Sequence, residues 1–222
     1  HWFNFNSKKK AKLNIEAHYD LGNNFYGMWL DKTMTYSSAI FYCNEETLEK
    51  AQENKMERII RNLCPLSEQS TICEIGFGWG SFATHILENT KWNYYGITLS
   101  KKQLDYTKIK LSKNIKKDNC QLFLKDYRDL NKKFDAIISI EMFEAVGEAF
   151  WNKYFYTINN CLKENGKAII QTILINDEKY FKYKNQVDFI QTYIFPGGLM
   201  ASDSIFKSMA DKFKLETLNT KS

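Results

Sequence analysis

Short apolar runs alternate with amphipathic stretches from about residue 70 onward. Runs of this length, ending in glycine or polar residues, predict buried strands, and the stretches between them predict helices. Strands that alternate with helices imply right-handed crossovers and a mostly parallel sheet with helices on both faces, which is an α/β fold. The predicted strands are residues 71–75, 92–98, 121–124, 134–140 and 167–175.

The chain divides into two parts by this pattern. Residues 1–66 are polar and aromatic, with apolar positions at partly helical spacing over 48–63, and we interpret them as an N-terminal helical cap. Residues 67–222 form the predicted core. A charged and aromatic segment at about 177–203 interrupts the core pattern and is followed by a predicted helix over 204–212.

A glycine-rich turn follows the first predicted strand. Gly76, Gly78 and Gly80 separate this strand from a helix that opens near Phe82, and Glu74 lies two positions before the first glycine. Glycines allow a tight turn and close approach of a ligand, and the helix N-terminus offers free N–H donors. The turn therefore indicates a nucleotide-type cofactor.

Two rival cofactor motifs fit less well. A dinucleotide site needs Gly-x-Gly-x-x-Gly and an acid near the end of the second strand, whereas this strand ends in Gly-Ile-Thr at Thr98 without a carboxylate. A phosphate-binding loop would need Gly-Lys-Ser/Thr, which does not follow here. A glycine turn used only for packing is the remaining alternative.

Ser100 is a plausible N-cap for the next helix.

Composition narrows the classes of partner. The net charge of +5, from 31 basic and 26 acidic residues, is too small to imply nucleic acid. Lysine clusters at 8–12 and 113–117 are read as solvated faces, with contact to a membrane surface as the alternative. The aromatic share of 15% suggests an aromatic-lined pocket or an apolar partner.

The five cysteines contain no Cys-x-x-Cys pair, so neither a zinc site nor a disulfide framework is indicated. No apolar run approaches the roughly 18 residues of a spanning helix, and no signal peptide is recognised. We therefore expect a cytoplasmic protein, associated at most peripherally with the inner membrane surface. The oligomeric state is left open.

The sequence resembles the cyclopropane-fatty-acyl-phospholipid synthases and mycolic acid cyclopropane synthases. Seven blocks carry the resemblance, in the family's order and over nearly the whole chain. They are Ala-His-Tyr-Asp-Leu-Gly at 17–22, Thr-Tyr-Ser-Ser-Ala at 35–39, Glu-Ile-Gly-Phe-Gly-Trp-Gly at 74–80, Gly-Ile-Thr-Leu-Ser at 96–100, Asp-Tyr-Arg-Asp-Leu at 126–130, Phe-Asp-Ala-Ile-Ile-Ser at 134–139 with Met-Phe-Glu at 142–144, and Phe-Pro-Gly-Gly at 195–198.

The resemblance implies the Rossmann-like fold of S-adenosylmethionine-dependent methyltransferases, with 67–222 as the methyltransferase core. It also implies cofactor contacts: the cap closes over the cofactor, the glycine turn holds its amino-acid end, 98–103 flank the ribose, and the 126–130 block flanks the adenine. The implied residues are Tyr36, Ser37, Glu74, Gly76, Gly78, Trp79, Gly80, Thr98, Leu99, Ser100, Gln103, Tyr127 and Arg128.

The resemblance further implies methyl transfer to a cis alkene of an acyl chain, without a metal. In the family a bound bicarbonate accepts the proton. The bicarbonate is bound by Cys, Glu, His and Tyr side chains and by the backbone of an Ile. The matching positions here are Ser38 for Cys, Glu144, Gln171 for His, and Ile173. The family's Tyr and its last antiparallel strand are expected beyond residue 218, outside this sequence. The resemblance predicts Glu144, Ser38, Gln171 and Ile173 as catalytic residues, and bicarbonate is a possible second cofactor.

The predicted activity is therefore transfer of a one-carbon unit to an unsaturated phospholipid acyl chain at a membrane surface, giving a cyclopropane or a methyl branch. Methylation of a small amine or other metabolite is an alternative, and Gln171 in place of His mildly favours it. A cofactor- or membrane-binding domain without turnover is a second alternative. Nucleic-acid methylation is disfavoured, because Glu141-Met-Phe-Glu144 follows the fourth strand instead of an Asp/Asn-Pro-Pro-aromatic motif.

Overall fold

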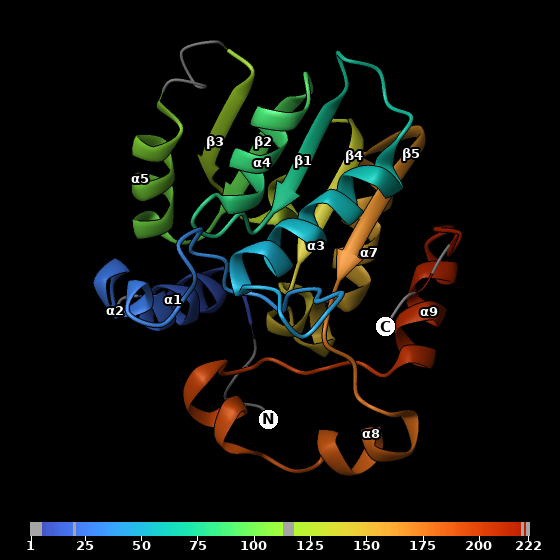
Figure 1. The fold of residues 1–222 in the computed structure, drawn as a ribbon. Coiled ribbons are helices and arrows are strands. Elements are labelled where there is room, and N and C mark those ends of the chain that lie inside the picture. Colours follow the sequence, from blue (N-terminus) through green and yellow to red (C-terminus); the bar gives the residue numbers. More distant parts are fainter. Residues whose placement is uncertain (1–5, 20, 113–117, 219, 221–222) are drawn as a thin grey trace.

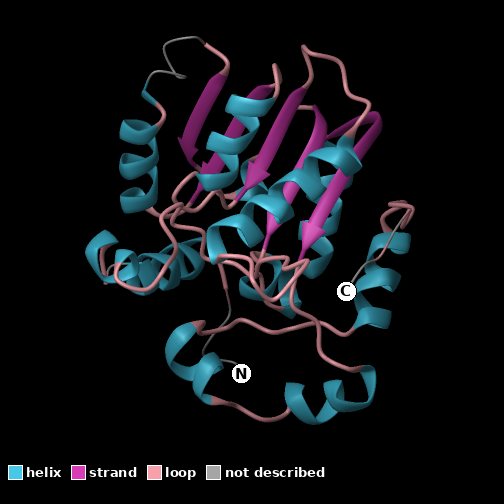
Figure 2. Cartoon of the chain, in the orientation of Figure 1, coloured by secondary structure: helices cyan, strands magenta, loops and turns pink. Residues whose placement is uncertain are grey.

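Five parallel strands form the centre of the molecule (Figures 1 and 2). The computed structural model describes residues 6–19, 21–112, 118–218 and 220. The sheet order is β3-β2-β1-β4-β5, and each neighbouring pair is parallel. The strands are β1 Thr71–Ile75, β2 Asn93–Thr98, β3 Cys120–Leu124, β4 Phe134–Ile140 and β5 Leu162–Gln171. The predicted α/β fold with a mostly parallel sheet is confirmed.

Helices cover both faces of this sheet. On one face α4 (Ser81–Asn89) and α5 (Lys101–Lys110) bury their apolar positions against β1 and β2. On the other face α7 (Glu148–Cys161) and α9 (Asp203–Lys212) complete a core that is rich in aromatic rings. The predicted N-cap is confirmed, because the Ser100 hydroxyl accepts the Gln103 N–H at 3.2 Å.

The N-terminal residues serve two purposes. The helices α1 (Lys8–Tyr19) and α2 (Asn23–Gly27) lie across the edge at which the strands end (Figure 1). The longer α3 (Leu48–Leu63) instead packs on the sheet and shares a buried cluster with β1 and α4. The predicted boundary of the cap at residue 66 stays a prediction. Because α3 packs on the sheet, it connects the N-terminal segment to the core.

The last strand differs from its prediction. β5 was expected over 167–175 but runs from Leu162 to Gln171. Its final ladder bond joins the Glu141 N–H to the Gln171 carbonyl at 2.8 Å. Beyond it, Thr172 and Ile173 donate to the Glu144 carboxylate instead of to a strand, so the chain leaves the sheet there. The prediction of a strand to Ile175 is therefore wrong.

The segment after β5 crosses below the strand ends before α9 (Figure 1). It contains α8 (Asp177–Lys184) and a π-helical turn, η4 (Ile190–Ile194). It therefore faces the cap helices across the carboxyl edge of the sheet. None of the helices among the described residues combines the length and the apolar composition that crossing a bilayer requires. The predicted lysine cluster at 113–117 lies outside the described residues.

Candidate active site

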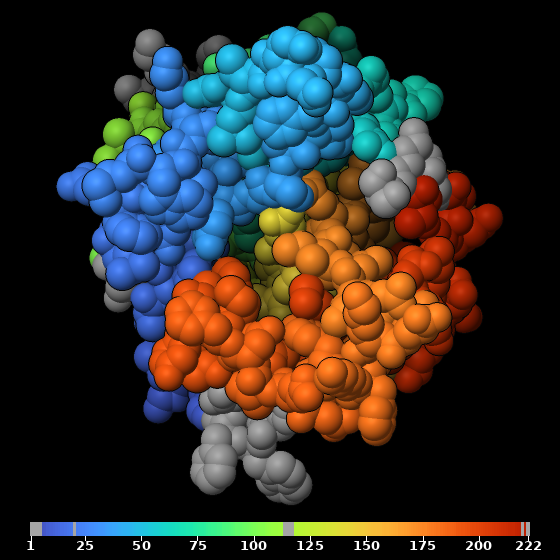
Figure 3. Space-filling view, turned by 60° about the horizontal axis from the view of Figure 1, so that its bottom comes forward, coloured from blue at the N-terminus to red at the C-terminus, as the bar shows by residue number. Residues whose placement is uncertain are grey.

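A cavity of about 530 Å³ opens at the carboxyl ends of β1, β2 and β4. Its walls come from the glycine turn, the cap and the segment 183–200. Figure 3 shows the hollow between the N-terminal segment and the orange segment after β5. Ligands of open parallel sheets bind at this edge, where the strand order reverses. The cavity is therefore the candidate site.

The glycine turn adopts backbone angles that favour glycine. Gly76, Gly78 and Gly80 have φ of 85°, 55° and 74°. A Cβ on Gly80 would lie 2.4 Å from the Thr107 methyl group, so this position tolerates no side chain. Gly76 and Gly78 line the cavity, whereas Gly80 lies behind the turn as the N-cap of α4.

Glu74 ends β1 with a buried carboxylate at the cavity wall. It is 3% exposed, and the Tyr94 hydroxyl donates to it. Burial is the main cause that raises its pKa to about 7, while the Tyr94 hydrogen bond and Lys55 act in the opposite direction. Such a carboxylate can bind an ammonium group that enters the cavity.

Lys55 from α3 fixes the cap segment at Ser37 and Ser38. It is 2% exposed, and its Nζ donates to the Ser37 hydroxyl at 2.6 Å and to the Ser38 carbonyl at 3.0 Å. Burial lowers its pKa to about 8, against the attraction of Glu141, Asp31 and Glu74. The sequence reasoning missed Lys55, although a lysine on the apolar face of a helix is a usable signal.

Neutral polar groups occupy the end of β2. The Thr98 hydroxyl donates to the Gln103 side-chain carbonyl at 2.9 Å and accepts the Ser100 N–H at 3.1 Å. Thr98, Leu99 and Gln103 line the cavity, whereas Ser100 caps α5 and does not. The place where many nucleotide sites carry an acid is thus filled by a threonine–glutamine pair.

Tyr127 and Arg128 also line the cavity. Tyr127 is buried, and its hydroxyl has no hydrogen-bond partner among the described residues. Arg128 is held by Asp126 through Nε at 2.8 Å and Nη2 at 2.7 Å, and its Nη1 donates to the Asn6 carbonyl at 2.9 Å. Its guanidinium therefore fixes the 126–129 turn to the N-terminal segment.

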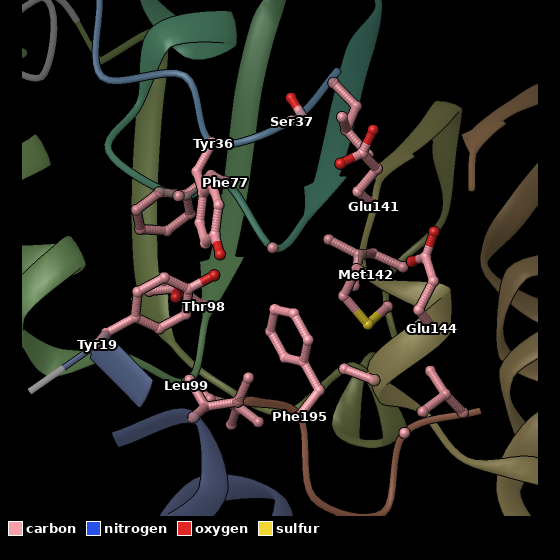
Figure 4. Close-up of a pocket in the computed structure, with 18 of the residues that line it drawn as sticks. Tyr19, Tyr36, Ser37, Phe77, Thr98, Leu99, Glu141, Met142, Glu144 and Phe195 are labelled. Carbon is pink, nitrogen blue, oxygen red and sulfur yellow. The ribbon is translucent and has the colours of Figure 1, made fainter. Parts of the chain in front are cut away.

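Aromatic rings form one side of the cavity (Figure 4). Tyr19 and Tyr36 from the cap line it together with Phe77, and the Tyr19 ring meets Trp79 at 5.3 Å. Trp79 is anchored through its Nε1, which donates to Asn23 at 2.9 Å. Phe195 points into the cavity from below in this view. Tyr19, Phe77 and Phe195 were not singled out from the sequence as site residues.

Carboxylates form the opposite side (Figure 4). Glu144 Oε1 accepts bonds from the Thr172 hydroxyl at 2.9 Å and from the Ile173 N–H, while its buried Oε2 has no partner among the described residues. Burial raises the pKa of Glu144. Glu144 and Ile173, two of the four residues predicted as catalytic, both line the cavity.

Ser38 and Gln171 also come together, but around a third carboxylate. The Gln171 amide donates to the Ser38 hydroxyl at 3.0 Å and to Glu141 Oε1 at 2.8 Å. Neither residue lines the cavity, whereas Glu141 does. Glu141 was not predicted as a site residue, although an acid directly after β4 stands at the ligand-binding edge of the sheet.

Comparisons with known proteins agree with this arrangement. Residues 6–222 match the family model for mycolic acid cyclopropane synthetase. The chain is 32% identical over 203 residues to the tuberculostearic acid methyltransferase UfaA1 of Mycobacterium tuberculosis, covering 88% of this chain and 47% of that protein. It is 34% identical over 206 residues to the cyclopropane-fatty-acyl-phospholipid synthase of Escherichia coli, covering 90% and 50%.

A solved structure shows the same fold. The mycolic acid cyclopropane synthase CmaA1, complexed with S-adenosylhomocysteine (SAH) and CTAB, superposes with a TM-score of 0.82 at 27% identity, covering 91% of this chain and 74% of that one. The chain thus has the Rossmann-like fold of the S-adenosylmethionine-dependent methyltransferases. It spans about half the length of the two curated relatives named above.

Proposed function

Because the chain belongs to the mycolic acid cyclopropane synthetase family, we propose that it transfers a one-carbon unit from S-adenosylmethionine to the cis double bond of an unsaturated phospholipid acyl chain. One observation carries this proposal. The glycine turn with Glu74 and the predicted acceptor residues Glu144 and Ile173 open onto one cavity, although they come from separate segments of the chain.

The cavity residues fit the cofactor. Glu74 offers a buried carboxylate for the amino group of the methionine part, and Gly76 and Gly78 allow close approach of the backbone. Thr98 and Gln103 offer neutral hydrogen-bonding groups for the ribose, and Tyr127 offers a ring for the adenine. S-adenosylmethionine supplies an electrophilic methyl group on a sulfonium sulfur. Tyr36 and Ser37 close this part of the cavity from the cap.

The rest of the cavity suits an alkene acceptor. An isolated double bond is a weak nucleophile and reacts only when it is held in line and shielded from water. Addition of the methyl group leaves a positive charge on the acyl chain, which aromatic faces stabilise. Phe77, Tyr36 and Phe195 provide such faces, and the Glu144 carboxylate lies opposite them (Figure 4). Loss of a proton from the new methyl group then closes a cyclopropane, whereas a different quenching of the cation leaves a methyl branch.

The rim of the cavity supports a lipid substrate drawn from a membrane. Phe189 and Tyr193 are 65% and 71% exposed on the segment after β5, which borders the hollow in Figure 3. Exposed Lys179 and Lys182 lie on α8 in the same segment. Exposed apolar side chains and lysines on the same segment suit the surface of an anionic bilayer. We propose that this segment contacts the phospholipid surface.

Expression of the full-length gene in a host that makes monounsaturated phospholipids tests the function. The expected result is acyl chains heavier by one methylene group, seen by mass spectrometry of the lipid extract. A matched strain that expresses the Glu74→Ala variant should contain fewer of them, because this variant binds the methyl donor more weakly. Two results together would contradict the proposed lipid substrate: unchanged lipids with every unsaturated substrate, and methylation of a small amine by the purified protein. The substrate would then be a soluble metabolite.

A further inference from the structure

Glu141 has a strained backbone at the wall of the cavity. It directly follows β4 and has a φ of 46°, a left-handed conformation that side chains other than those of glycine, asparagine and aspartate rarely adopt. Its N–H is fixed by the Gln171 carbonyl at 2.8 Å. Strain of this kind persists where the surroundings hold it, and it often marks a functional position. Glu141 lines the cavity with this strained backbone.

Three donors hold this carboxylate. Glu141 Oε1 accepts the Ser38 N–H at 2.8 Å, the Ser38 hydroxyl and the Gln171 amide at 2.8 Å. Gln171 is in turn fixed to the Ser38 hydroxyl at 3.0 Å. Among the described residues, all hydrogen bonds to this side chain end on Oε1. Oε2 is therefore the oxygen left to accept a proton.

A bound bicarbonate does not fit this arrangement. Ser38 and Gln171 are two of the four residues that the family resemblance assigns to bicarbonate, and both already donate to Glu141. The carboxylate of Glu144 faces the same cavity and repels Glu141 electrostatically, so another anion would be a third negative charge there. The Glu141 carboxylate thus already accepts the hydrogen bonds of Ser38 and Gln171 that the resemblance assigns to bicarbonate.

We propose that Glu141 accepts the proton in the reaction, in place of bicarbonate; this inference rests on the proposed function. The π electrons of the alkene form a bond to the methyl carbon, and the electron pair of the carbon–sulfur bond stays on sulfur. A proton of the transferred methyl group passes to Glu141 Oε2. The electron pair of that carbon–hydrogen bond closes the three-membered ring, and Glu141 later releases the proton to water.

Ser38 and Gln171 are positioning residues in this scheme. Their bonds to Oε1 hold the carboxylate in one orientation, and Lys55 holds Ser38 through its carbonyl at 3.0 Å. Glu144 is bound instead to Thr172 and Ile173. The two carboxylates thus have separate anchors, and their substitution should have separable effects.

The test uses the purified full-length protein with S-adenosylmethionine and vesicles of monounsaturated phospholipid, in buffer depleted of bicarbonate. The wild type should turn over equally with and without added bicarbonate. Glu141→Gln should lose about 100-fold in turnover, the usual contribution of a general base. Its affinity for SAH in calorimetry and its melting temperature should stay unchanged. Glu45→Gln, an exposed glutamate of the cap segment, is the matched control.

A second variant separates a proton acceptor from a structural residue. Glu141→Gly relieves the strained φ and leaves Ser38 and Gln171 free, so added bicarbonate or formate should restore part of its turnover. A structural role predicts no rescue by an anion.

Three outcomes would overturn the inference: turnover of Glu141→Gln within about threefold of the wild type, a wild type that requires bicarbonate, or a folded glycine variant that no anion rescues. A wild type without turnover on any vesicle contradicts the proposed function, and this inference with it.

Discussion

The two sides of the cavity are built differently. The cofactor side consists largely of one strand, one glycine turn and the adjoining strand end, so its residues are close in sequence: Glu74 to Trp79 and Thr98 to Gln103. On the acceptor side, Glu141 at the end of β4 lines the cavity, and it is held by Ser38 of the cap and Gln171 at the end of β5, which do not line the cavity themselves. Most of the first side is formed by neighbouring parts of the chain, whereas Glu141 and its anchors come together only when three distant segments meet.

The charges of the two sides differ as well. The cofactor side holds the Glu74 carboxylate and the Asp126–Arg128 ion pair, while the acceptor side holds the carboxylates of Glu141 and Glu144. Lys55 attracts both Glu141 and Glu74. This division suggests that cofactor affinity and turnover depend on different residues, and substitutions can test that separation.

Removing the charge of Glu144 should have the largest effect. Glu144→Gln keeps the shape of the side chain but removes the negative charge that faces the positive acyl chain, and we expect a loss of roughly 100-fold in turnover. SAH affinity should stay within about twofold, as measured by calorimetry. Glu164→Gln, on an exposed part of β5, is the control. An equal loss of turnover and of cofactor affinity would contradict the claim that the two depend on different residues.

A substitution of Glu74, on the cofactor side, should affect cofactor affinity instead of turnover. Glu74→Gln removes one charged hydrogen bond to the ligand's amino group, which corresponds to about 2 kcal/mol and a roughly 30-fold weaker affinity for SAH. Turnover at saturating donor should change little, so the Michaelis constant for the donor should carry the effect. A variant with normal affinity and reduced maximal turnover would show that Glu74 belongs to the chemistry instead.

The raised pKa of Glu74 adds a pH dependence. Its carboxyl keeps a proton up to about pH 7 in the unliganded protein, and only the ionised form attracts an ammonium group. Affinity for SAH should therefore rise about tenfold from about pH 6 to about pH 8. Because the folded pKa is raised, the stability linked to this group is present below about pH 4.5 and is lost as the pH rises through about 7.

The matched experiment compares wild type and Glu74→Gln by calorimetry over this pH range. The variant should bind SAH with an affinity that changes little with pH. A wild-type affinity that falls with rising pH would mean that another group controls binding.

The smallest predicted effect concerns the rim. Phe189→Ser combined with Tyr193→Ser removes exposed apolar surface, and binding to anionic phospholipid vesicles should weaken roughly tenfold in a sedimentation assay. Affinity for SAH should not change. Leu218→Ser is the control, because Leu218 is 73% exposed beyond α9. If both variants bind the vesicles equally well, the proposal that the rim contacts the membrane is wrong.

The sequence predicted the cofactor side more completely than the acceptor side. Strand alternation and the glycine turn placed residues 74–80 at the carboxyl edge, because those features depend on neighbours in the chain. The end of β5 was missed, because Thr172 and Ile173 turn toward Glu144, a residue distant in sequence. Glu141 was missed for the same reason, since its role depends on Ser38 and Gln171, which reach it only through the fold.

The central claim is that the chain moves a one-carbon unit from S-adenosylmethionine to an acyl double bond. The most direct test is incubation of the purified full-length protein with S-adenosylmethionine whose methyl group carries three deuterium atoms, and vesicles of monounsaturated phospholipid. Mass spectrometry should show acyl chains heavier by one CD₂ unit, because one deuteron of the transferred methyl is lost to the protein. Acyl chains without added mass, while the cofactor is bound, would contradict the claim.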